Sequence, residues 1–175
     1  WLLVIGAAML FLGIPPSGEQ VARAVVFYLM TLLYGGLWFI LAMLFSVLFR
    51  APATSALVSI AAWLLFTVFW PMITGIVAQG LAGLHPLVQA QIKHEVALIS
   101  PNNLFGESTL AMLSPSTRSL GPVVYSQLEG AVMGRPLPFG QSLLLIWPHI
   151  TAFVAGIILL FVLAYVKFQR IEIRA

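Results

Sequence analysis

The sequence has no cysteine and no aspartate, and five glutamates are its only acidic residues. The lack of cysteine excludes disulfides, thiol nucleophiles and cysteine-ligated metal sites. With so few carboxylates, chemistry that needs paired acids has little to draw on. Charged residues make up only 7% of the 175 residues, against about 25% in soluble domains. A fold of this size could not cover its surface with so few charges, which excludes a soluble domain and a disordered chain.

Apolar residues dominate instead, at 61% of the chain, with a mean hydropathy of +1.06, and they predict a membrane protein. The net charge of +3 forms no basic stripe, so we expect no nucleic-acid partner. Trp1 opens directly into an apolar run with no basic region before it, which disfavours a signal peptide. We expect the sequence to begin inside a transmembrane helix, as the C-terminal part of a longer protein.

A membrane-spanning helix needs about 20 apolar residues. Four stretches qualify, the first of them truncated: residues 1–14, 24–49, 53–78 and 143–166. The predicted fold class is therefore all-α, a polytopic helical membrane protein with about four spans. Prolines at positions 71 and 148 are expected to kink the third and fourth spans.

The distribution of basic residues predicts the orientation. Arg50 follows the second span, and Lys167, Arg170 and Arg174 follow the last. The opposite side has Arg23 and a long loop whose three basic and three acidic residues cancel. The positive-inside rule therefore places the C-terminus in the cytoplasm and the loop, residues 79–142, outside.

The long outer loop shows three short helical patterns, each too short to cross a membrane. They cover Val88 to Ile99 between Pro86 and Pro101, Leu104 to Leu113, and a segment from Pro122 to Gly134. Such amphipathic or re-entrant helices should lie at the interface or dip partly into the bilayer. Two interpretations stay open, a passive surface cap and a gate over the exit of a translocation path.

Polar residues of the outer side are the candidate site residues. Glu107 and Glu129 are candidates for an outer gate, although the sequence favours the simpler interpretation that both are solvated. His85, His94 and His149 all map to the outer side and could form a metal site. Their spacing fits no ligand motif, and the alternative is that they are interfacial polar residues beside prolines.

The chain has no phosphate-binding glycine-rich loop and no metalloprotease or nucleophile-elbow motif, so we expect neither catalytic residues nor an enzyme. The spans contain no acidic residue, Lys or Arg, which argues against a proton relay within them. Small residues offer faces for close helix contact. They are Gly35 and Gly36, the pair Ser55 and Ser59, and the pair Ala152 and Gly156.

Local patterns and the order of the spans carry a resemblance to a known family. The patterns are Tyr-Gly-Gly-Leu-Trp at 34–38, Leu-Phe-Ser-Val-Leu-Phe-Arg at 44–50, the turn at 50–56, Ser-Pro-Asn-Asn-Leu-Phe at 100–105, and the tail at 168–174. With this arrangement the chain resembles the membrane subunit of type-2 ABC exporters, and it is similar to the permeases grouped with multicopper-enzyme maturation.

The resemblance implies a six-span permease in which residues 1–14 end the third span. It implies a second permease copy in a homo- or heterodimer, separate ABC ATPase subunits, membrane lipid around the spans, and a prokaryotic plasma membrane. ATP would be bound and hydrolysed on the partner, with no cofactor in this chain. Arg50 and Pro52 in the cytoplasmic turn would then contact the ATPase, although Arg50 could equally be a positive-inside anchor.

The function predicted is thus a permease subunit of an ATP-driven transporter, in the direction of export. The alternative is a membrane scaffold that assembles or anchors an exported enzyme complex without transporting. An intramembrane enzyme is the third interpretation, and the missing acids and cysteines oppose it.

Overall fold

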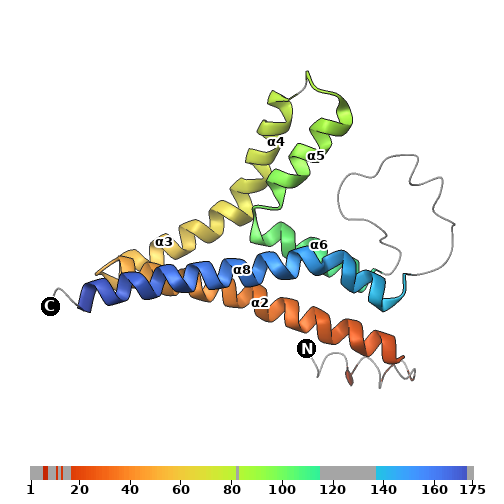
Figure 1. Cartoon of the computed structure of the whole chain (residues 1–175), viewed down its shortest axis with the longest axis horizontal. Coiled ribbons are helices and arrows are strands. Elements are labelled where there is room, and N and C mark those ends of the chain that lie inside the picture. The colour runs from red at the N-terminus through yellow and green to blue at the C-terminus, as the bar shows by residue number, and fades with distance from the viewer. Residues whose placement is uncertain are drawn as a thin grey trace.

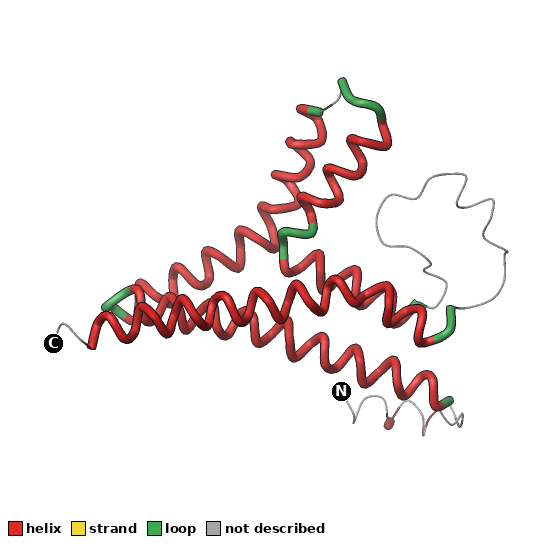
Figure 2. The backbone as a smooth tube through the Cα atoms, viewed as in Figure 1, coloured by secondary structure: helices red, strands yellow, loops and turns green. Residues whose placement is uncertain are grey.

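The chain folds into helices throughout the part that can be described (Figure 1). The computed structural model describes residues 6–7, 11, 13, 17–81, 83–114 and 137–172, with side chains to residue 170. All regular elements in these ranges are helical, and the loops between them are short (Figure 2). The prediction of an all-α fold is confirmed.

The first long helix, α2 (Gly18–Leu48), begins at a capping box. The Ser17 hydroxyl accepts from the Gln20 backbone N–H, and the Gln20 side chain accepts from the Ser17 backbone N–H. This pairing satisfies amide groups that a helix start leaves open. The helix therefore begins six residues before the apolar run that predicts the span at 24–49.

The second long helix is continuous but contains one π-helical turn. It consists of α3 (Pro52–Leu64), η1 (Leu65–Phe69) and α4 (Trp70–Gly80). Pro52 is the first residue of α3, a position where its missing N–H costs no hydrogen bond. The whole segment is long and apolar enough to cross a membrane.

Two short helices and one long helix follow. The short ones are α5 (Pro86–Ala97) and α6 (Pro101–Leu113), and each has proline in its first turn. They confirm two of the helices predicted for the outer loop, although α5 lies two residues earlier than expected and α6 starts three residues earlier. The last helix is α8 (Phe139–Glu172), which continues through Pro148.

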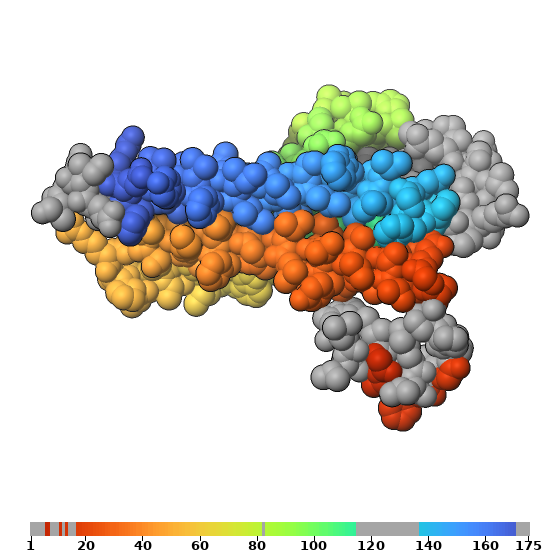
Figure 3. Space-filling view, turned by 60° about the horizontal axis from the view of Figure 1, so that its bottom comes forward, coloured from red at the N-terminus to blue at the C-terminus, as the bar shows by residue number. Residues whose placement is uncertain are grey.

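Helices α2 and α8 lie side by side, and α6 packs against both of them (Figures 1 and 3). The buried core forms where these three helices meet, and it consists of Met30, Leu37, Ala111, Met112, Ile146 and Phe153. Helices α4 and α5 pack on each other and rise away from the α2–α8 pair, while α3 packs on the half of α2 that ends at Leu48.

Three helices in the described part of the chain can cross a membrane, namely Gly18–Leu48, Pro52–Gly80 and Phe139–Arg170. They are helical where the second, third and fourth spans are predicted, and each is long and apolar enough to serve as one. The predicted first span, residues 1–14, lies almost wholly outside the described residues, as does the predicted helix from Pro122 to Gly134. The count of four spans therefore stays a prediction.

Candidate functional site

Helices α5 and α6 meet at a tight turn, residues 98–100, which reaches the middle of the bundle, and they diverge from it: α5 runs beside α4, and α6 runs beside α8 (Figure 1). We call the two helices and this turn the hairpin. The Ser100 hydroxyl donates to the Phe66 carbonyl at 3.1 Å, and Trp70 Nε1 donates to the Val96 carbonyl at 3.0 Å. Phe66 is at the centre of Pro52–Gly80, about 21 Å from either end at a rise of 1.5 Å per residue. The tip of the hairpin therefore lies level with the middle of Pro52–Gly80. Of the two positions predicted for the loop helices, at the interface or partly within the bilayer, this depth favours the second.

The π-turn explains why Ser100 is needed there. Within η1 the Trp70 N–H donates to the Leu65 carbonyl, five residues back. The next donor in this register would be residue 71, but Pro71 has no N–H. The Phe66 carbonyl is thus left without a backbone donor, and the fully buried Ser100 hydroxyl supplies one. A neighbouring helix satisfies the carbonyl that proline frees, as a membrane interior requires.

A cluster of aromatic side chains packs the first half of α6 against α2 and α8. The Tyr34 hydroxyl of α2 donates to Asn102 Oδ1 at 3.1 Å. The Tyr34 ring stacks on Phe105, with centroids 4.7 Å apart, and meets Phe153 of α8 edge-on at 6.4 Å. Tyr34 therefore contacts both the re-entrant hairpin and the last span, near the middle of α2.

Glu107 of α6 lies between two histidines from other helices. Its Oε1 is 3.3 Å from His94 Nδ1 of α5, and its Oε2 is 3.2 Å from His149 Nε2 of α8. The Glu107 side chain is 23% exposed, so it is partly enclosed between the two rings. Its role as a gate stays a prediction. Glu129, the other gate candidate, lies outside the described residues.

The three histidines, which the sequence left as a possible metal site, do not come together. His85 caps the start of α5, where its Nδ1 accepts from the Leu87 N–H, and it is exposed. His94 and His149 instead share one carboxylate. Among the described residues, no group of three histidine, cysteine or acidic side chains could hold a metal ion.

The structural role of Arg23 could not be seen from the sequence. Arg23 is only 6% exposed and lies near the outer end of α2. Its guanidinium donates to Glu19 Oε1 at 2.8 Å, to the Ser142 hydroxyl at 3.1 Å, and to the carbonyls of Met112 at 3.3 Å and Leu137 at 2.6 Å. One side chain thus joins the outer ends of α2, α6 and α8. The spacing of Glu19 and Arg23, four residues apart on one helix, was the only sequence signal.

The opposite end of the molecule carries the predicted ATPase contact. Arg50 lies exposed in the short turn between α2 and α3, and Pro52 begins α3. In Figure 1 this turn and the end of α8 lie at the same end of the bundle. Lys167 and Arg170, near the end of α8, are exposed as well. The structure therefore gathers Arg50 and the described basic residues of the tail at one end, away from the hairpin.

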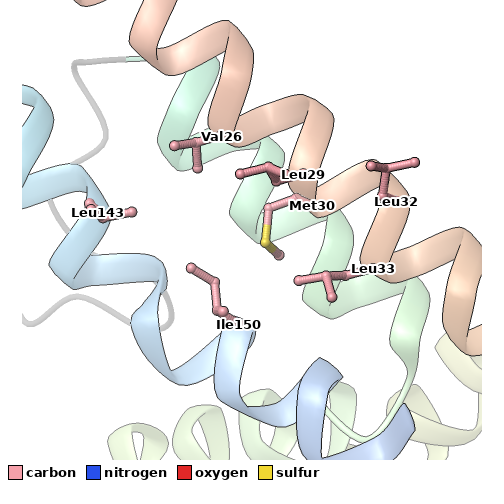
Figure 4. A pocket seen from close by; sticks show the side chains of 7 residues that line it. All are labelled: Val26, Leu29, Met30, Leu32, Leu33, Leu143 and Ile150. Carbon is pink, nitrogen blue, oxygen red and sulfur yellow. The ribbon is translucent and has the colours of Figure 1, made fainter.

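An open apolar cavity of about 440 Å³ lies between α2 and α8 (Figure 4). Seven side chains line it: Val26, Leu29, Met30, Leu32, Leu33, Leu143 and Ile150. Since none of these side chains is polar, the cavity suits hydrocarbon and offers no hydrogen bond by which a polar substrate could be oriented.

Comparison with known proteins gives one finding. The model of a family described as ABC-2 family transporter protein matches residues 2–173, nearly the whole chain. No curated protein and no solved structure gives a significant match.

Proposed function

The chain belongs to the ABC-2 transporter family, and from that premise we propose that it is the permease subunit of an exporter that lines the substrate path together with a second permease. As a permease of an ABC transporter, the chain is a multi-pass membrane component and not the catalytic one. We place ATP binding and hydrolysis on a separate ATPase subunit. We also place the protein in a prokaryotic plasma membrane with its C-terminus in the cytoplasm, as the basic residues at that end favour.

The observation that carries this proposal, beyond the family match, is the path of α2. This helix runs from the Arg50 turn past Arg23 to Gly18, about 46 Å for its 31 residues at 1.5 Å each. Along the way it bonds the re-entrant hairpin twice, through Tyr34 to Asn102 and through Arg23 to the Met112 carbonyl. A movement of the cytoplasmic turn is thus transmitted by one rigid element to the outer hairpin.

In this proposal the α5–α6 hairpin is the outer gate. ATP binding on the partner subunits biases the permease between an inward and an outward state, since a ligand shifts an equilibrium by its preference for one state. The gate opens when α5 and α6 separate at the contact between His94 and Glu107. Glu107 contacts both α5 and α8 and is the residue that this movement would release.

The proposed ATPase contact is tested at the cytoplasmic turn. Arg50→Glu should lower ATP-driven transport several-fold while insertion stays normal, because an exposed acid replaces the cation in the contact. Arg50→Lys, which keeps the charge, is the matched control. Unchanged transport in the glutamate variant, at normal expression, would mean that Arg50 is only a membrane anchor.

The function itself is tested by co-purification with an ATPase subunit, followed by ATP hydrolysis and uptake in inside-out vesicles. An exporter accumulates substrate in such vesicles when ATP is added. Candidate substrates should include those of the permeases grouped with multicopper-enzyme maturation, which the sequence patterns resemble. Stable co-assembly with an exported enzyme, without ATP-dependent uptake of any candidate, would favour the scaffold instead.

A further inference from the structure

The contact between His94 and Glu107 joins two groups of helices that otherwise diverge. Helix α5 packs on α4, whereas α6 packs on α2 and α8. The two short helices meet at the tip, where Ser100 bonds Phe66 and the Asn103 side chain bonds the Ala97 carbonyl at 2.9 Å. His94 lies six residues before Ser100 and Glu107 seven residues after it. Their contact therefore lies further out than the tip, across the two arms of the hairpin.

The two histidines on Glu107 have different surroundings. The His149 side chain is 6% exposed, and its Nδ1 is enclosed without any hydrogen-bond partner. A proton added there would bury an unpaired N–H, which is costly. The His94 side chain is 18% exposed, and neither of its ring nitrogens is among the enclosed unpartnered atoms of the described residues. The second ring nitrogen of His94 is thus not enclosed in the way that His149 Nδ1 is.

We propose that His94 is a proton-binding site that controls the outer hairpin, an inference that rests on the proposed gate. When His94 is protonated, its contact with the Glu107 carboxylate becomes an ion pair and holds α5 against α6. When the proton leaves, only the weaker neutral contact remains, and α5 moves away with α4. Histidine suits this role because its charge changes between about pH 5 and 8. His149 has a different part: its Nε2 contacts Glu107 Oε2 and orients the carboxylate from α8.

Other charged groups of the described region leave this pair isolated. On α5, Lys93 and Glu95 are exposed beside His94, and α4 has no ionisable side chain. Besides Glu107, α6 has no charged residue, and α8 presents His149. On α2, Arg23 and Glu19 are paired with each other further out, and Tyr34 bonds Asn102. Within the described ranges, therefore, Glu107 is the one acid that contacts His94.

The test measures the separation of α5 and α6 directly. Because the sequence has no native cysteine, two can be introduced at exposed positions, Gln91 on α5 and Leu110 on α6, and spin-labelled. The distribution of distances between the two spin labels is recorded by double electron–electron resonance. The full chain is measured in lipid nanodiscs at about pH 5.5 and pH 8. Neither substrate nor ATPase subunit is needed, and spin labels do not titrate in this range.

The expected result is a larger short-distance population at the lower pH, because an ion pair attracts α5 and α6 more strongly than a neutral contact does. His94→Gln should remove this pH dependence, and His94→Lys should keep the short distance at both pH values. His149→Gln should weaken closure yet keep the dependence. His85→Gln, on the same helix but away from Glu107, is the matched control and should behave as the parent.

Two outcomes would overturn the proposal: a parent distribution that is the same at both pH values, or a pH dependence that survives His94→Gln. Either result leaves the permease assignment intact, since the measurement involves no transport. Conversely, if the protein neither bound an ATPase nor transported any substrate, the proposed function would be wrong. The measured dependence of the distance on pH would be unaffected.

Discussion

Gly156 of α8 faces the side chain of Leu37 of α2 so closely that a β-carbon added to it would lie 3.2 Å from Leu37 Cδ1. The small-residue face predicted at Ala152 and Gly156 thus includes a position where the two longest helices cross. Gly36 on α2 is looser, since a β-carbon there would be 3.7 Å from Ile157 Cδ1. Close approach of this kind lets backbones pack by van der Waals contact, which drives helix association in a membrane.

Gly156→Val should therefore destabilise the bundle by about 1–3 kcal/mol, the usual cost of overpacking. Gly35→Ala is the control, because a β-carbon at Gly35 meets nothing within 4 Å. Thermal melting in detergent should show a lower Tm for the valine variant and an unchanged or higher Tm for Gly35→Ala. Equal melting of the two variants would show that the crossing at Leu37 is not tight.

Ser100→Ala leaves the Phe66 carbonyl without a donor in the bundle interior. Losing the partner of a buried polar group costs about 1–3 kcal/mol, so this variant should be less stable than the parent. Pro71→Ala returns a backbone N–H near that carbonyl and should reduce the cost of Ser100→Ala. The double-mutant cycle measures this coupling directly. Additive effects of the two changes would contradict the pairing of Ser100 with the freed carbonyl.

Arg23→Met removes a buried guanidinium that bonds three helices and leaves Glu19, which is half-exposed, without its partner. Breaking a buried ion pair costs about 3–5 kcal/mol, and the exposure of Glu19 should keep the loss near the lower end. Arg23→Lys should rescue only partly, because an ammonium cannot reproduce the guanidinium fork. The measurement is protease sensitivity of the outer ends of α6 and α8, which should rise in the order parent, lysine, methionine.

The orientation is tested with single cysteines at exposed turn positions. A cysteine at Leu84, between α4 and α5, should react with a membrane-impermeant maleimide from outside intact cells. A cysteine at Ala51, between α2 and α3, should react only after the cells are opened. The reverse pattern would invert the topology and place the hairpin in the cytoplasm.

Hydropathy alone predicts the three described spans, because each is a long uncharged run. Hydropathy predicts the first and last residues of these helices less accurately. Helix α2 begins at Gly18 because the capping box of Ser17 and Gln20 starts it there, whereas hydropathy responds only to apolar residues. The bounds of α5 and the end of α6 follow from prolines and apolar spacing, which are local signals.

The contacts of the site could not be predicted in the same way. His149 and Glu107 are 42 residues apart, and Arg23 and Ser142 are 119 apart. Which residues meet depends on how deeply the hairpin enters the bundle, and that depth is set by the π-turn before Pro71 and by the Ser100 bond. From the sequence alone, Arg23 can be recognised only as a positively charged residue near the end of a span. Its burial becomes visible once α6 and α8 are placed beside α2.

The hydrogen bonds from Arg23 to the Met112 and Leu137 carbonyls also suggest where the polypeptide could be cut in two without loss of the fold. These two carbonyls lie on either side of residues 115–136, so the outer ends of α6 and α8 are tied through space as well as along the backbone. A cut within that interval would leave two fragments that share the core of α2, α6 and α8. We therefore expect the halves, expressed as separate polypeptides, to reassemble in the membrane.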